Sequence, residues 1–346
     1  MSDLSHRWTR RAFAGQAAIA AASAVIGVSH GRASAEPPPE TTRIRLPLGP
    51  SICLAPQYLA NDLLRSEGFT DIEWVSGGPT GLANAGTEGA RRLGAADVDV
   101  MTNFAAPLVV ALDQGIRITV LAGVHVGCFD LIATEKVRTI KDLKGKTVAV
   151  LSLGSAQHVF LSAIATQVGL DPRRDINWLT YPADVAKELL RQGKIDAFLG
   201  FPPDPQELRA RRIGHVVLSS AIDRPWSQYF CCLVVANREF VSRYPIATKR
   251  VVRAILKGDQ ICAADPERAA RAYIDRGFAT NRDYAVQAIK EIPYGRWREY
   301  DPGDTLRFYA LRLREAGMIK SAPQKIMAEG SDWRILNELK KELKGG

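Results

Sequence analysis

The chain has 346 residues, and at about 150 residues per domain this length predicts two domain-sized bodies or one large α/β unit. Hydrophobic residues make up 46% and charged residues 24% of the chain, a balance that excludes a disordered or collagen-like protein. The net charge of +9 indicates either a mildly basic surface kept soluble by its charge, which we favour, or an anionic partner.

Residues 1–35 differ in composition from the rest of the chain. Arg7, Arg10 and Arg11 precede a long Ala-rich apolar run, and Ala33-Ser34-Ala35 offers a small-x-small cleavage site. The segment around Arg10 and Arg11 resembles a twin-arginine export signal. We therefore expect export by this route, cleavage near Ala35 and a periplasmic location, with the ordinary secretory route or an uncleaved anchor as alternatives. After residue 35 no apolar run reaches the about 18 residues that span a membrane.

The five cysteines show no metal-binding spacing, and their odd number leaves at least one thiol unpaired. Two of them are adjacent in a strand-like run and point to opposite faces, so they are poorly placed to bridge each other. We expect buried, unpaired thiols that act as small apolar fillers, and neither a metal nor a cofactor. The five are Cys53, Cys128, Cys231, Cys232 and Cys262.

The first part of the chain alternates strands and helices. Residues 42–48 alternate apolar and polar side chains, break at Gly49-Pro50, and precede a run with apolar residues at helical spacing. Pro56 fits that helix only in its first turn. We expect strands at 42–48, 72–75, 98–101 and 117–123, helices at 55–64, about 82–93 and 103–114, and a turn or ligand-side loop at 76–79.

The alternation restarts after Gly127. Strands are expected at 129–134, 147–151, 176–181, 197–201, 216–218 and 229–237, and helices at 140–143, 155–168, 183–192 and 205–211. From about residue 245 nearly every segment has helical periodicity. Strands and helices that alternate at this spacing predict largely parallel sheets covered by helices on both faces.

Four segments carry a resemblance to a known family. They are AADVDV at 95–100, ALDQG at 111–115, TIKDLKGKTVAV at 139–150 and GKIDAF at 193–198. Each segment alone could occur by chance, but their order and spacing make chance a poor explanation. From about Arg43 to Phe240 the chain resembles the nitrate/sulfonate/taurine-type periplasmic substrate-binding proteins, which serve ABC importers.

The resemblance implies an α/β, two-lobed periplasmic-binding-protein fold (type II), each lobe a largely parallel sheet covered by helices, with a helical C-terminal segment. Residues 43–127 and 237–346 would form lobe 1, and residues 128–236 would form lobe 2, with hinge strands at both ends of lobe 2. A small solute would be captured between the lobes and delivered to a membrane permease and its ATPase. We expect a monomer without catalytic residues and without a nucleic-acid partner.

Candidate ligand contacts lie where strands end, because open α/β sheets bind ligands at the carboxyl ends of their strands. Ala55, Pro56 and Gln57 open the first long helix, whose unpaired N–H groups would hold a polar group, unless Pro56 only starts the helix. Asn103 and Phe104 follow the strand at 98–101. The amide of Asn103 would offer a donor and an acceptor to the ligand, or would cap the next helix.

Residues 152–158 are the most informative of these segments. A Gly-containing turn between a strand and a helix directs backbone donors and the positive end of the helix dipole toward the cleft. Ser155 and Gln157 are the candidate contacts, and Ser155 is also a good helix cap. His158 either contacts the ligand or lies in solvent.

A further strand end and the two crossings between the lobes supply the other candidates. Phe201 and Pro202 follow a strand, and Phe201 would form an apolar wall. The neighbouring Asp204 conflicts with an anionic ligand unless it faces solvent or pairs with Arg209. Three residues at the crossings would cover the ligand or pack against the hinge: Cys128, Phe129 and Tyr229.

Two rival functions remain beside transport. A sensory module would signal to a membrane receptor, and the sequence does not separate it from a transport protein. A thiamine-pyrimidine-synthase-like enzyme would need a Cys- and His-rich iron-binding segment, which the chain lacks, and His125, His158 and His215 are too scattered for a ligand cluster. The basic charge and the helix end favour a small oxyanion, sulfonate or carboxylate as the solute, although the neutral candidate contacts would also suit a bulky aromatic solute.

Overall fold

A computed structural model describes residues 36–77, 86–278 and 281–343. Residues 38–346 belong to one compact unit. The predicted export signal, residues 1–35, lies outside the described residues, and so do residues 78–79 of the loop expected at 76–79, which begins at the end of β2 (Asp71–Ser76). Among the described helices none is long and apolar enough to cross a membrane.

The strands before residue 127 form two sheets, one of which is completed by a strand from much later in the chain. Strand β2 lies parallel to β1, and the order of the second sheet is β3-β10-β4. Every residue of β3, β10 and β4 is buried, which explains why their sequences are nearly continuous apolar runs. The remaining elements of this part are β1 (Arg43–Leu48), η1 (Ile52–Leu54), α2 (Ala55–Ser66), α3 (Thr87–Gly94), β3 (Val100–Phe104), α4 (Ala105–Asp113), β4 (Ile118–Val126) and β10 (Phe230–Asn237).

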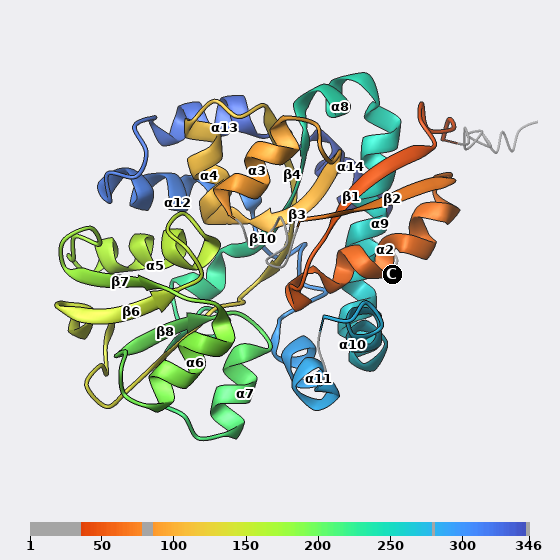
Figure 1. The fold of residues 1–346 in the computed structure, drawn as a ribbon. Helices are drawn as coiled ribbons and strands as arrows, with labels where there is room; N and C mark the ends of the chain where they lie inside the picture. Colours follow the sequence, from red (N-terminus) through yellow and green to blue (C-terminus); the bar gives the residue numbers. More distant parts are fainter. Residues whose placement is uncertain (1–35, 78–85, 279–280, 344–346) are drawn as a thin grey trace, which may run out of the picture. The chain divides into compact units, whose positions relative to one another are not determined.

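A five-stranded sheet of order β7-β6-β8-β5-β9 occupies the middle of the chain. Helix α5 lies on one face of this sheet, and α6 and α7 lie on the other (Figure 1). Its elements are β5 (Asp130–Ala133), η2 (Ile140–Leu143), β6 (Lys146–Val150), α5 (Ala156–Gln167), β7 (Ile176–Thr180), α6 (Ala183–Arg191), β8 (Ala197–Gly200), α7 (Asp204–Ala210), β9 (His215–Ser219) and η3 (Trp226–Gln228).

Most strands run in the same direction within each sheet, as the expected largely parallel sheets require, and each of the two larger sheets contains one antiparallel strand. Strands β6, β7 and β8 are parallel, but β5 runs antiparallel to β8 and β9, and β10 runs antiparallel to β3 and β4. In both sheets the antiparallel strand is inserted between two strands that a helix connects. No helical crossover joins the inserted strand to its neighbours, so nothing forces it to be parallel.

The segment after residue 237 is helical, as the periodicity predicts from about residue 245 onward, and much of it packs on the strands and helices before residue 127. Long helix α9 lies against α2 so closely that a Cβ atom at Gly258 would sit 2.2 Å from the carbonyl oxygen of Pro56. The helices are α8 (Arg238–Arg243), α9 (Pro245–Ala264), α10 (Pro266–Ile274), α11 (Arg282–Glu291), α12 (Pro302–Glu315), α13 (Pro323–Gly330) and α14 (Arg334–Glu342).

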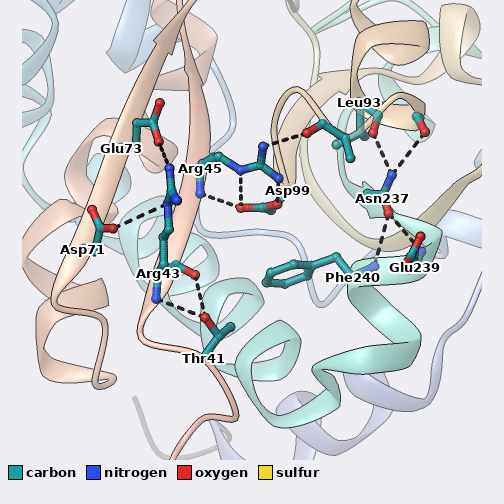
Figure 2. Close-up of polar contacts among 12 residues, drawn as sticks. Thr41, Arg43, Arg45, Asp71, Glu73, Leu93, Asp99, Asn237, Glu239 and Phe240 are labelled. Carbon is teal, nitrogen blue, oxygen red and sulfur yellow. Dashed lines mark hydrogen bonds and ion pairs between the residues drawn. The ribbon is translucent and has the colours of Figure 1, made fainter.

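Two aspartates of the recognised segments bind neighbouring strands in the same way. Asp99 accepts from the backbone N–H of Arg45 at 2.8 Å and pairs with its guanidinium at 2.5 Å, as Figure 2 shows. Asp196 likewise accepts from the backbone N–H of Thr147 at 3.0 Å and pairs with Lys136. Each carboxylate connects a loop to the first residues of a strand, so these motif residues position the sheets rather than a ligand.

Asn237 is the last residue of β10 and the N-cap of α8, and its side chain bonds both to α8 and to α3. Its Oδ1 accepts from the N–H groups of Glu239 and Phe240, which caps the helix, and its Nδ2 donates to the carbonyl oxygens of Leu93 and Gly94 (Figure 2). The amide therefore holds α8 against the end of α3.

One predicted boundary is wrong in a place that matters for the site. We expected the strand to end at residue 101 and the helix to begin at residue 103, but β3 continues through Phe104 and α4 begins at Ala105. Antiparallel pairing with β10, where Asn103 lies opposite Leu233, extends the strand by these residues. Asn103 is thus a strand residue, not a loop residue beyond the strand.

Candidate functional site

A cavity of about 440 Å³ lies between the sheet of β6 to β8 and the C-terminal helices. Its wall is formed by residues that precede and begin α5, α6 and α7, and by residues of α10, α11 and the segment between them. Six aromatic side chains line it: Tyr181, Phe198, Phe201, Tyr273, Phe278 and Tyr284. A cavity of this volume with largely aromatic walls has the size and character of a small-molecule site.

Gln157 brings an unsatisfied polar atom to this cavity. The side chain is 3% exposed and lines the cavity from the first turn of α5, and its Oε1 has no hydrogen-bond partner. A buried amide oxygen without a partner costs about 1 to 3 kcal/mol, which a donor on a bound molecule would recover. Gln157 is therefore the described side chain best placed to bind a polar group in the cavity.

A buried ionic group forms another part of the wall. Lys187 of α6 pairs with Asp204 at 3.0 Å and with Glu207, and all three line the cavity. Burial disfavours the charged lysine, but the two carboxylates outweigh it and raise its pKa. Burial raises the pKa of Asp204, against the effect of Lys187. The lysine charge is thus already balanced within the protein.

Our expectation that Asp204 faces solvent or pairs with Arg209 is wrong. Asp204 pairs with Lys187, whereas Arg209 binds Asp130 of β5 at 2.6 Å and also pairs with Glu291 of α11. The first turn of α7 directs Asp204 toward α6, and Arg209 lies further along the helix on the side of β5 and α11.

A second cavity of about 400 Å³ lies next to the connection between β4 and β5. Cys128 and Pro202, both predicted ligand contacts, line this cavity rather than the first one. Its charged wall, Asp130, Arg209 and Glu291, is internally paired. The structure thus divides the predicted contacts, since Gln157 and Phe201 line the main cavity and these two line the second.

Three other predicted contacts, Ala55, Pro56 and Gln57, have structural roles at the beginning of α2. Gln57 donates to the carbonyl of Pro47 and accepts from the N–H of Thr102, both at 2.9 Å, which links β1 to β3. Ala55 and Pro56 are buried in the first turn of α2, and Pro56 starts that helix as its alternative role predicts. The polar group of this segment is therefore used inside the protein.

Asn103 has both ends of its amide engaged. The Oδ1 atom accepts from the N–H of Phe104 at 2.7 Å, and Nδ2 lies 3.4 Å from the carbonyl of Gly86. The alternative role of a helix cap is wrong, because Phe104 occupies the N-cap position of α4. The side chain is fully buried.

Ser155 and His158 shape the turn that precedes α5. Ser155 is the N-cap and accepts from the N–H of His158, and Nδ1 of His158 accepts from the N–H of Gly154 at 3.1 Å. The imidazole packs edge-on against Trp178. Burial lowers the pKa of His158 to about 4, so the ring is neutral near pH 7.

The aromatic candidates form a continuous cluster rather than separate ligand covers. Phe104 lies between Phe129 and Phe201, with ring centroids 5.1 and 6.4 Å away, and Phe129 stacks on Phe160 at 4.7 Å. Tyr229 stacks on Phe308 at 3.9 Å. Of these rings Phe201 lines the main cavity, so the cluster connects that wall to the core.

Sequence reasoning missed most of the cavity wall. Tyr181 directly follows β7, so the strand-end rule applied to that strand would have found it. Tyr273, Phe278 and Tyr284 lie in or between helices of the C-terminal segment and follow no motif. Only the packing of those helices against α6 and α7 makes them part of the site.

The thiols are buried and unpaired, as predicted, but three of them lie together with a histidine. The ligand atoms of Cys53, His125, Cys128 and Cys232 all lie within 4.8 Å of one another. The spacing of the cysteines along the sequence does not reveal this cluster, because its residues are scattered along the chain and meet where η1, β4 and β10 converge.

The chain belongs to the NMT1-like family, whose model matches residues 38–274. The bicarbonate-binding protein CmpA of Synechococcus elongatus is 27% identical over 109 residues, which are 32% of this chain and 24% of CmpA. The match thus spans about a quarter of that relative's length.

Solved structures show the same fold. The alkanesulfonate-binding protein SsuA from Xanthomonas axonopodis pv. citri, bound to MOPS, has a TM-score of 0.64 at 16% identity, over 82% of this chain and 96% of SsuA. The periplasmic nitrate-binding protein NrtA from Synechocystis PCC 6803 has a TM-score of 0.69 at 15% identity, over 90% of this chain and 91% of NrtA. The α/β periplasmic-binding-protein fold inferred from the sequence is confirmed.

Proposed function

We propose that this protein is the solute-binding component of an ABC importer of the nitrate/sulfonate/bicarbonate type. Membership of the NMT1-like family and the binding proteins that share the fold support this function. The observation that carries it is the aromatic cavity with the unsatisfied Oε1 of Gln157 in its wall. The partners are a membrane permease and its ATPase, and the binding protein acts as a monomer.

The two lobes that we propose are residues 43–127 with 237–346, and residues 128–236. Both contribute to the main cavity, the second through Gln157 and Phe201 and the first through Tyr273 and Tyr284. A solute that contacts both lobes stabilises the closed form, because only that form supplies both halves of the site. The permease would then recognise the closed form.

The lining supports an organic solute over the small oxyanions that the sequence favoured. Nitrate or bicarbonate would fill a small part of about 440 Å³, and the charge of Lys187 is already balanced by Asp204 and Glu207. Six aromatic side chains suit a flat or aliphatic body. We propose a solute with such a body and a hydrogen-bond donor that reaches Oε1 of Gln157.

A thermal-shift screen of residues 36–346 tests this function. The panel contains nitrate, bicarbonate, taurine, alkanesulfonates, aromatic carboxylates and pyrimidines. A solute present at about 100 times its Kd should raise the free energy of unfolding by about 2.7 kcal/mol, which is a rise of several degrees in Tm. Shifts from aromatic solutes support the proposal. Shifts from nitrate or bicarbonate alone contradict the solute class, and no shift from any member contradicts the binding function.

We also propose export by the twin-arginine route with cleavage near Ala35, on the sequence of residues 1–35. Mass spectrometry of the periplasmic fraction should find a mature chain that begins near Glu36. Replacing Arg10 and Arg11 together by lysine should leave uncleaved precursor in the cytoplasm. Normal export of that double variant would contradict the route.

A further inference from the structure

Three cysteines and one histidine from separate parts of the chain meet in the core. Cys53 lies in η1, His125 in β4, Cys128 in the connection from β4 to β5, and Cys232 in β10. Their ligand atoms all lie within 4.8 Å of one another. The side chains are at most 6% exposed, and of the four Cys128 lines the second cavity.

This donor set matches the requirements of a tetrahedral zinc site. Three thiolates and one imidazole form a common structural zinc set, with Zn–S distances of about 2.3 Å and Zn–N distances of about 2.0 Å. Tetrahedral geometry at these lengths separates the ligand atoms by about 3.5 to 3.8 Å. The limit of 4.8 Å on the observed separations is compatible with that arrangement after small side-chain rotations.

Backbone carbonyl groups surround the ring of His125. Its Nδ1 lies 3.2 Å from the carbonyl oxygens of Val126 and Gly127, and its Nε2 lies 3.2 Å from the carbonyl oxygen of Cys53. A protonated ring donates to carbonyls from both nitrogens, whereas a neutral ring donates from one and leaves the other without a donor. After a small rotation that second nitrogen can coordinate a metal ion, while the N–H group donates to a carbonyl, as it does in most metal-bound histidines.

A polar contact from outside the cluster reaches Cys53. The Oγ atom of Ser51 lies 2.9 Å from its Sγ, at a distance where the hydroxyl can donate to the sulfur. Such hydrogen bonds from outside the ligand set orient metal-bound sulfur. The cluster therefore has ligands and supporting contacts at the same buried point.

We propose that Cys53, His125, Cys128 and Cys232 form a structural site for a zinc-class divalent cation. Four protein ligands complete the tetrahedral coordination, so the site has no open position for chemistry. Binding releases the thiol protons and involves no change of oxidation state. The ion would join η1 and β10 to the connection between β4 and β5, a role that is separate from solute binding and does not depend on it.

Cobalt titration of the chelator-treated, reduced chain of residues 36–346 tests the site. Co²⁺ should bind with one equivalent per chain and produce the thiolate charge-transfer and tetrahedral d–d absorption of a thiolate-rich site, and Zn²⁺ should displace it. Zn²⁺ should also raise the Tm by several degrees, since an ion that binds only the folded state stabilises it.

Serine variants of the cysteines test whether the cobalt absorption comes from the four proposed ligands. Cys232→Ser and Cys128→Ser should each weaken the charge-transfer band and lower the affinity for Co²⁺ at least tenfold. Cys262→Ser is the matched control, because Cys262 is also buried and unpaired but lies outside the cluster, and it should retain both. Circular dichroism establishes that each variant is folded.

Three results would overturn the proposal. One is the absence of thiolate-to-cobalt absorption in the wild-type chain, and another is an unchanged spectrum in folded Cys232→Ser and Cys128→Ser. The third is a disulfide between two of the three cysteines in protein taken from the periplasm, detected by mass spectrometry without reductant. Because the wild-type titration and the disulfide analysis use no variant, they decide the question even if both variants fail to fold.

Discussion

Buried polar atoms in helix α5 differ in what surrounds them. Oε1 of Gln157 and Oγ of Ser162 both lack a hydrogen-bond partner, but of the two only Gln157 lines the main cavity. A solute bound in the main cavity can therefore donate a hydrogen bond to Gln157, whereas it does not reach Ser162.

Gln157→Leu should weaken solute binding without destabilising the protein. The substitution keeps the approximate volume and removes a buried amide, so the free energy of unfolding should stay equal or rise. The Kd of the solute found by the screen should rise about tenfold, which is about 1.4 kcal/mol. Isothermal titration calorimetry and urea unfolding measure the two quantities. Ser162→Ala is the control and should leave the Kd unchanged, and an equal loss in both variants would contradict a role for Gln157 in binding.

His158 should contribute to loss of stability in acid. Burial lowers its pKa in the folded chain to about 4 from 6.5. The unfolded chain therefore takes up a proton at a higher pH than the folded chain, and the free energy of unfolding falls as the pH drops from about 6.5 to 4. The loss is at most about 3 kcal/mol. His158→Asn should flatten this part of the stability curve, as urea unfolding at several pH values measures, and an unchanged slope would refute the assignment.

Among the helices, α2 and α9 pack so closely that the sequence is restricted at their contact. Gly258 allows the backbone of α9 to approach the carbonyl of Pro56, at the beginning of α2. Several predicted ligand contacts lie in that first turn, and the close packing explains why they are buried. The position needs glycine because any side chain would occupy space already filled by backbone.

Gly258→Ala should destabilise the protein by about 1 to 3 kcal/mol. Alanine favours a helix over glycine by about 1 kcal/mol, so helix propensity alone predicts the opposite sign. The same exchange at Gly303 in α12 is the control, because the nearest atom there is the side-chain Oδ1 of Asp301 at 3.1 Å. Thermal unfolding of both variants measures the difference. A Tm for Gly258→Ala at or above that of the wild type would show that the two helices separate without cost.

On the scale of the whole molecule, few polar contacts join the two proposed lobes next to the second cavity. Glu291 of α11 accepts from Gln206 at 2.7 Å and pairs with Arg209, both of α7. These contacts belong to the form in which α7 and α11 are close. They are partly exposed, so their contribution is small and depends on salt.

Glu291→Ala should lower solute affinity although Glu291 does not line the main cavity. Loss of a partly exposed ionic contact costs about 0.2 to 1 kcal/mol. Because this contact stabilises the closed form that binds the solute, its loss should raise the Kd of the solute by up to about fivefold. Calorimetry at low and high salt should show the difference shrinking as salt rises. Glu267→Ala is the matched control, since Glu267 pairs with Arg282 within the C-terminal helices alone. Equal affinities of the two variants would contradict a closure contact.

Local sequence patterns were enough to predict the order and the boundaries of most elements. Period-two and period-3.6 patterns are local, and so are the cap at Ser155 and the Thr139–Asp142 capping box of η2. The ordered segments from 95 to 198 also sufficed to identify the fold, and in this chain Asp99 and Asp196 of those segments bind the first residues of β1 and β6.

Contacts between distant parts of the chain determine which strand inserts between which others and which residues share a cavity. Antiparallel pairing with β10 turned Asn103 from a loop residue into a strand residue. The packing of α10 and α11 placed Tyr273 and Tyr284 in the wall of the cavity that Gln157 also lines, and the meeting of η1, β4 and β10 gathered Cys53, His125, Cys128 and Cys232. The physical reason is the same in each case: these contacts join residues tens to hundreds of positions apart, and no local pattern of hydrophobicity or turn residues records them.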